Sequence, residues 1–72
     1  MFVEGGMKIL LNGDSAETAA GATVETLLQQ LGISRERVAV ELNGDIIPKV
    51  GYDTQLLSDD DKIEIVHFVG GA

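Results

Sequence analysis

The end of the chain carries the pattern closest to chemistry. A predicted strand over residues 63–69 runs directly into Gly70, Gly71 and Ala72. Glycine has no side chain to bury and loses the most backbone freedom when ordered, so a glycine pair adds little to a core. Such a pair suits an extended segment that threads a narrow slot. We therefore expect the reactive group to be the chain's own C-terminal carboxylate, held in another protein's active site. The alternative is a small terminus without function.

Composition limits the classes of function. The chain has 72 residues, a net charge of −7, one histidine and no cysteine. This length allows one domain with one small core. The absence of cysteine excludes disulfides, thiolate nucleophiles and zinc–thiolate sites. The negative charge argues against nucleic acid and anionic membranes as partners. It favours a basic protein partner, with a merely solubilising acidic surface as the alternative.

Two other groups of polar residues are weaker candidates for a site. Asp59, Asp60 and Asp61 are consecutive, whereas calcium loops alternate their ligands and include a glycine, so we expect a solvated turn and no metal. His67 lies on the inward face of the last strand and has no evident nucleophile or carboxylate partner, so we expect a partly buried packing residue. No pair of titratable groups is arranged for acid–base work, and we expect neither an enzyme nor a bound cofactor.

The elements that must position the tail follow from turn and helix signals. Strands are predicted over residues 7–12 and 15–18, with a hairpin turn at Asn12-Gly13 or Gly13-Asp14. A helix follows, capped by Thr23 at its start and ended by Gly32. The apolar stripe of this helix has the spacing of one helical face. Its members are Val24, Leu27, Leu28 and Leu31.

The second half of the chain is predicted to add three strands. Residues 38–42 alternate apolar and polar, Asn43-Gly44 is a second hairpin signal, and a short strand at 46–47 stops at Pro48. The loop over residues 49–57 is expected to close the open end of the core. The side chains expected to do so are Tyr52, Leu56 and Leu57. The last strand, residues 62–69, is the most apolar and is expected to lie in the centre of the sheet.

This order of elements predicts an α+β domain of the β-grasp, ubiquitin-like kind, with a mixed sheet of four to five strands and one helix on one face. A long connection separates the first and last strands, so they are expected to pair in parallel. Residues 1–6 are interpreted as a flexible extension, 7–69 as the domain and 70–72 as a flexible tail. The start of the chain lacks the features of a signal peptide, and we expect a cytoplasmic location.

The last strand also predicts a docking patch. If Ile63 and Ile65 face the helix, alternation sends Val66 and Phe68 to the uncovered face, directly before the tail. An exposed aromatic residue beside a reactive tail is a plausible contact for a partner protein. The alternative is that the loop over residues 49–57 covers both side chains.

The segment from Val38 to Pro48 and the ending from Ile63 to Gly71 resemble the ThiS family, the sulfur carrier proteins of thiamine biosynthesis. The resemblance implies that a ThiF-like adenylating enzyme uses ATP to attach AMP to the terminal carboxylate. Sulfur from a donor such as a cysteine desulfurase then gives a thiocarboxylate, which a ThiG-like thiazole synthase consumes. Many members end in glycine, so Ala72 is either the reactive end or is trimmed to expose Gly71.

Two alternatives stay open from the sequence. The sequence also resembles the small subunit of molybdopterin synthase, which has the same fold, the same kind of tail and the same tail chemistry. A β-grasp binding module without tail chemistry is the other reading. Deletion of residues 70–72 tests the second alternative, because it abolishes the function of a carrier and leaves the function of a binding module intact.

Overall fold

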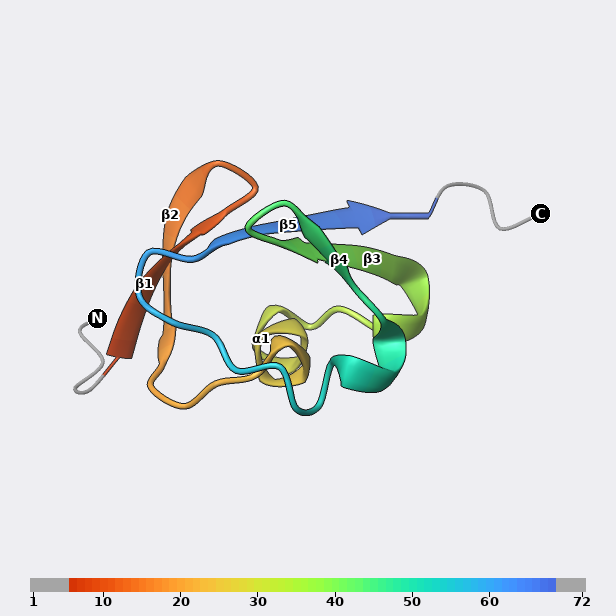
Figure 1. Ribbon diagram of the computed structural model, residues 1–72, viewed down its shortest axis with the longest axis horizontal. Coiled ribbons are helices and arrows are strands. Elements are labelled where there is room, and N and C mark those ends of the chain that lie inside the picture. Colours follow the sequence, from red (N-terminus) through yellow and green to blue (C-terminus); the bar gives the residue numbers. More distant parts are fainter. Residues whose placement is uncertain (1–5, 69–72) are drawn as a thin grey trace.

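The computed structural model describes residues 6–68, which form one mixed sheet with a helix on one face (Figure 1). The sheet order is β2-β1-β5-β3-β4, which places the last strand in the centre as predicted. β1 and β5 run parallel, and the other strand pairs are antiparallel. The predicted β-grasp fold is confirmed. In chain order the elements are β1 (Gly6–Leu11), β2 (Asp14–Ala19), α1 (Val24–Leu31), the 3₁₀ turn η1 (Arg35–Arg37), β3 (Val38–Leu42), β4 (Asp45–Ile47), the 3₁₀ turn η2 (Lys49–Gly51) and β5 (Lys62–His67).

Both predicted hairpin turns form at the Asn-Gly pairs. Asn12 and Gly13 have φ of 50° and 87°, and Asn43 and Gly44 have φ of 51° and 90°. Positive φ at both central residues gives the turn whose twist matches that of the flanking strands, and Asn-Gly suits it best. These local signals therefore fix the registers of β1–β2 and β3–β4.

Helix α1 begins and ends as the sequence predicts. The Thr23 hydroxyl accepts a hydrogen bond from the Thr26 N–H at 3.1 Å. Gly32 follows the last helical residue with φ of 72°, and the Ile33 N–H donates to the Leu28 carbonyl at 2.9 Å. This is the left-handed helix end that glycine favours. The apolar stripe differs from prediction at its last member, because Leu31 is 38% exposed.

The core lies between α1 and the inner face of the sheet. Alternation in β3 and β5 is as predicted, with Val38, Val40, Leu42, Ile63 and Ile65 buried. Tyr52 and Leu57 are buried too and close the open end. The third residue predicted there, Leu56, is 59% exposed, so that prediction is wrong. The cause is local: Leu56 pairs with Thr23 in an isolated bridge, and neighbouring residues of an extended segment point in opposite directions.

The element bounds differ from prediction at both ends of the domain. β1 already begins at Gly6, which pairs with Ala19, so Gly6 belongs to the domain and not to the predicted extension. β5 ends at His67, two residues before the predicted end. Residues 1–5 and 69–72 lie outside the described residues. Across residues 6–68, no helix has both the length and the apolar character needed to cross a membrane.

Candidate functional site

The predicted reactive residues Gly70, Gly71 and Ala72 lie outside the described residues, so the site is built from the part of the domain that leads to them. β5 supplies this part. Its last residues are held on one side by β3, where Val38 pairs with His67 and the Phe68 N–H donates to the Arg37 carbonyl at 2.9 Å. His67 and Phe68, called here the root of the tail, therefore continue an ordered central strand.

Val66 and Phe68 lie on the face of the sheet that α1 leaves uncovered. They are 53% and 56% exposed, while Ile63 and Ile65 beside them are buried. The predicted orientation is thus confirmed, and the alternative of burial under the loop over residues 49–57 is wrong. Ile46 of β4 is 72% exposed and belongs to the same face. Ile46 stands in line with Glu41 and Glu64 on this face, so Val66 and Phe68 alone are called here the open-face patch.

Lys49 contributes a contact that the sequence analysis missed. Its Nζ lies 5.4 Å from the centroid of the Phe68 ring, within the range of a cation–π interaction. Glu36 Oε1 lies 3.7 Å from the same Nζ. The ammonium is therefore placed at the root of the tail by η1 and η2 together. Lys49 and Phe68 are far apart in the sequence, so no local pattern predicts this contact.

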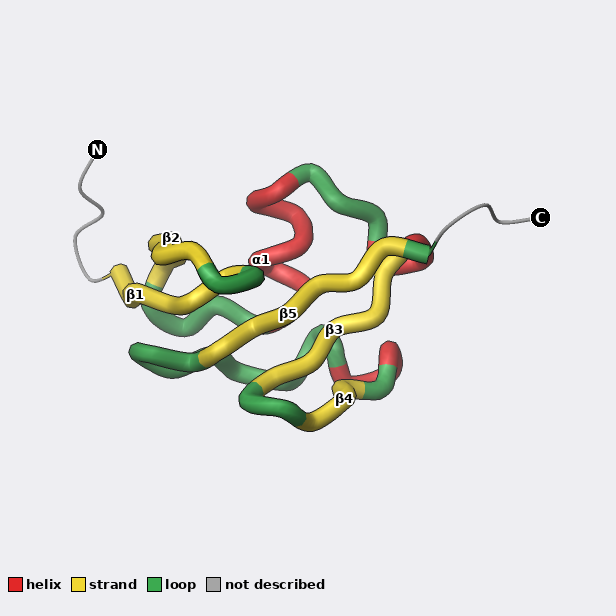
Figure 2. The backbone as a smooth tube through the Cα atoms, turned by 90° about the horizontal axis from the view of Figure 1, so that it is seen from above, coloured by secondary structure: helices red, strands yellow, loops and turns green. Residues whose placement is uncertain are grey.

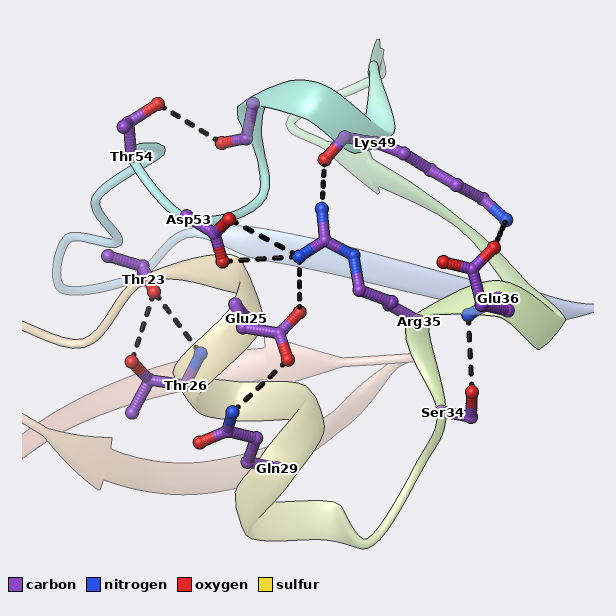
Figure 3. Close-up of polar contacts among 11 residues, drawn as sticks. Thr23, Glu25, Thr26, Gln29, Ser34, Arg35, Glu36, Lys49, Asp53 and Thr54 are labelled. Carbon is purple, nitrogen blue, oxygen red and sulfur yellow. Dashed lines mark hydrogen bonds and ion pairs between the residues drawn. The ribbon is translucent and has the colours of Figure 1, made fainter.

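Arg35 ties these two 3₁₀ turns to the helix (Figure 3). Its Nη1 lies 3.4 Å from Glu25 Oε1 and 3.2 Å from Asp53 Oδ1, and its Nη2 donates to the Lys49 carbonyl. The guanidinium also stacks over the Tyr52 ring at 5.3 Å. One side chain thus links α1, η1 and the loop after β4. It is a structural contact that holds Lys49 in place.

Two asparagine side chains hold β5 from opposite sides. The Asn12 Oδ1 accepts from the Ile65 N–H at 2.8 Å, and its Nδ2 donates to the Ile65 carbonyl at 3.3 Å. The Asn43 Oδ1 accepts from the Lys62 N–H at 3.0 Å. These side chains, which also form the turns, fix the start and middle of the strand that leads to the tail.

The remaining polar candidates have local roles. The Asp59 carboxylate accepts from the Lys8 N–H at 2.9 Å, and the Asp61 carboxylate accepts from the Ser58 N–H at 2.7 Å. Over residues 6–68, His, Cys, Asp and Glu side chains form no group of three or more suited to a metal ion. His67 is exposed, so the predicted packing role is wrong. α1 lies beneath the middle of the sheet, whereas His67 ends β5 beyond it (Figure 1).

Comparisons with known proteins place this geometry in a family. The ThiS family model matches residues 9–71, a range that includes Gly70 and Gly71. The sulfur carrier protein ThiS of Escherichia coli is 32% identical over 65 residues, which cover 90% of this chain and 98% of that protein. A thiazole synthase of Magnetococcus marinus is 48% identical over 65 residues, 90% of this chain but only 20% of that longer protein.

A solved structure supports the same assignment. The crystal structure of the thiamine biosynthesis protein ThiS from Geobacter metallireducens superposes with a TM-score of 0.79 at 32% identity. The match covers 92% of this chain and all of that one. The resemblance seen in the sequence is thereby confirmed in both sequence and fold, and the chain belongs to the ThiS family.

Proposed function

We propose that this protein is a sulfur carrier of thiamine biosynthesis whose C-terminal carboxylate is converted to a thiocarboxylate. The observation that carries the proposal is the family match, which runs through Gly70 and Gly71 and stops one residue before Ala72. In this role the protein is a co-substrate of partner enzymes. The reactive carboxylate belongs to Ala72, or to Gly71 if Ala72 is removed.

The chemistry explains why a tail is needed. A carboxylate is a poor electrophile until one of its oxygens becomes a good leaving group. Its oxygen attacks the α-phosphorus of ATP in a ThiF-like enzyme, pyrophosphate leaves, and an acyl-adenylate forms. A hydrosulfide ion then attacks the acyl carbon and AMP leaves with the bonding electrons, which gives the thiocarboxylate. Enclosure of the acyl-adenylate limits its hydrolysis, and a slender glycine tail is able to enter such an enclosure.

The names of the relatives favour the thiamine branch over molybdopterin synthesis. A segment related to this chain is part of a protein named thiazole synthase. This supports thiazole synthase as the acceptor of the sulfur. A cysteine desulfurase as the sulfur donor, and a cytoplasmic location, stay predictions from the sequence.

The open-face patch is the proposed docking contact. Val66 and Phe68 lie more than half exposed beside the tail root. The net charge of −7 favours a partner whose matching surface is basic around an apolar centre. An exposed aromatic residue at the centre of such a contact is the usual source of much of the binding energy.

The test is the intact mass of the protein after incubation with a ThiF-like enzyme, MgATP and sodium sulfide. We expect a gain equal to the difference between one sulfur and one oxygen atom. A variant that lacks residues 70–72 is expected to show no gain, and the spectrum also reports whether Ala72 is retained. The proposal fails if neither the full chain nor a variant that lacks only Ala72 is modified while a carrier ending in Gly-Gly is converted under the same conditions.

A variant that lacks only Ala72 separates the two possibilities for the terminus. If Ala72 is itself the reactive end, the full chain and the shortened chain are both converted without loss of a residue. If Ala72 must be removed, only the shortened chain is converted by the purified enzyme.

A further inference from the structure

The central strand has neighbours on both sides along only part of its length. β3 pairs with β5 from Leu42↔Ile63 to Val38↔His67. β1 pairs with β5 only at Leu10↔Lys62 and Leu11↔Ile63. Figure 2 shows the consequence: β3 follows β5 towards its C-terminal end, whereas the β1–β2 hairpin ends near the middle of β5.

The Asn12 side chain extends this pairing by one step. The chain turns away at Asn12-Gly13, and the carboxamide of Asn12 bonds both main-chain groups of Ile65 in place of the backbone of a longer β1. Beyond Ile65, the described part of the chain provides no strand on this side of β5.

The main-chain groups of His67 face this open side. The Lys62 carbonyl accepts from Asn43 and the Phe68 N–H donates to Arg37, so the even-numbered residues of this segment bond towards β3. The Ile63 carbonyl accepts from the Asn12 N–H at 2.9 Å, so the odd-numbered residues bond towards β1. By this alternation His67 directs its N–H and carbonyl to the side that β1 has left. Among residues 6–68 neither group has a hydrogen-bond partner.

The layer below the open edge is partly apolar. α1 ends on this side of β5, and the segment that leads to η1 continues there (Figure 2). Leu31, the last residue of α1, is 38% exposed although it belongs to the apolar stripe. Leu31 therefore adds exposed apolar surface on the side of β5 where an added strand would lie.

We propose that the adenylating enzyme adds an extended segment of its own backbone to the sheet here, bonded to the main chain of His67. This inference rests on the proposed function, because it identifies how the partner that receives the tail grips its root. An extended peptide is the ligand that matches a donor and an acceptor on one strand edge. The outer edges of β2 and β4 are less suited to pairing with an added strand, because charged side chains, short length and proline oppose it. β2 carries Asp14 and Glu17, and β4 is three residues long and is followed by Pro48.

Amide hydrogen exchange tests the proposal directly. In the free protein we expect the His67 N–H to exchange much faster than the Phe68 N–H, which donates to Arg37. In a saturated complex with the adenylating enzyme, the His67 N–H should become protected. Rapid exchange at His67 in a complex that still adenylates the tail overturns strand addition and leaves the carrier function intact. Protection that appears in the carrier alone and rises with its concentration overturns it in favour of a second copy.

A pair of variants at one position gives an independent test. His67→Pro removes the N–H, and His67→Ala removes the imidazole but keeps the N–H. The fold tolerates both, because no described residue uses this N–H and the preceding Val66 already has the extended conformation that proline requires. Circular dichroism and thermal melting of each variant verify this.

The expected difference lies in the affinity for the adenylating enzyme. The proline variant should bind about tenfold more weakly than the alanine variant, the value of one main-chain hydrogen bond. Equal affinities for two folded variants overturn strand addition. If neither the native chain nor the chain that lacks Ala72 is adenylated, the proposed function fails, and strand addition to that enzyme fails with it.

Discussion

Arg35 is predicted to be the side chain on which the stability of the tail-proximal end depends most. It contacts Glu25 on α1, Asp53 and the Lys49 carbonyl in the loop after β4, and the Tyr52 ring. Replacement of Arg35 by Met keeps most of the apolar stem and removes the guanidinium. The change therefore isolates the polar contacts from the packing of the side chain.

The size of the effect is set mainly by Glu25. Its side chain is 20% exposed. Its Oε2 accepts from Gln29 Nε2 at 3.2 Å, whereas its Oε1 is buried without a hydrogen bond, so the ion pair with Arg35 at 3.4 Å offsets the burial of Oε1. Leaving a buried acceptor without any partner costs ~1–3 kcal/mol. Asp53 is 63% exposed and adds at most ~1 kcal/mol. Because one guanidinium makes all these contacts, we expect a total loss of ~2–4 kcal/mol in the free energy of unfolding.

Urea unfolding followed by far-ultraviolet circular dichroism measures this loss. Arg37→Met is the matched control, since Arg37 belongs to the same 3₁₀ turn, is exposed and forms no ion pair with residues 6–68. It should change the unfolding free energy by less than ~0.5 kcal/mol. Arg35→Lys should fall between the two, because it keeps the charge but loses the planar fork.

A second change at Glu25 shows where the loss arises. In the Arg35→Met background, Glu25→Gln removes the charge that has lost its ion-pair partner and should restore ~1 kcal/mol. The reasoning is refuted if Arg35→Met is no more destabilising than Arg37→Met. If Glu25→Gln destabilises the Met variant further, the loss does not arise from the buried Glu25 charge, and that part of the reasoning is refuted.

Two smaller changes test the strand that leads to the tail. Asn12→Gly keeps the left-handed turn but removes both side-chain hydrogen bonds to Ile65, so we expect a loss of ~1–3 kcal/mol and faster amide exchange at Ile65; unchanged exchange there would contradict the clamp. Glu64→Gln removes one of two like charges, because Glu64 stands directly opposite Glu41 in β3–β5. The variant should gain ~0.2–1 kcal/mol in urea unfolding at low salt and less at 1 M salt; a loss of stability would show that the pair does not repel.

The sequence predicted those parts of the fold that depend on a few neighbouring residues. Asn12-Gly13 and Asn43-Gly44 specify their turns through positive φ, and Thr23 and Gly32 specify the ends of α1. Alternation in β3 and β5 then specified which side chains are buried. Each of these features is decided within one turn or one strand, so no knowledge of distant contacts was needed.

The errors arose where a distant segment decides the outcome. Leu56 and Leu57 are equally apolar, and only the bridge between Leu56 and Thr23 sends one outwards and the other into the core. The position of His67 depends on how far α1 extends beneath the sheet. The contacts of Arg35 join segments that are separate in the chain, and arginine in a polar stretch gives no signal for them.

The candidate site divides in the same way. The exposure of Val66 and Phe68 followed from alternation alone, whereas the reactive tail, residues 70–72, stays a prediction from its composition. The open edge at His67 could not be predicted, because it depends on where β1 stops pairing with β5. The sequence shows that the turn begins at Asn12, but only the register Leu11↔Ile63 shows which part of β5 this leaves without a neighbour.

The position of the tail on the central strand has a thermodynamic consequence for docking. Fixing the backbone of one residue costs ~1–2 kcal/mol, and a partner that must order a strand as it binds loses that amount from its affinity. Here β3 already holds β5 as far as Phe68, and Asn12 and Asn43 hold it from the two sides. The segment that precedes the tail, His67 and Phe68, is therefore already ordered in the free domain, and a partner loses no affinity by ordering it. One edge of β5 stays open at His67, so this part of the strand is both ordered and accessible. A strand with neighbours on both sides at this position would be ordered but would have no main-chain groups free for a partner.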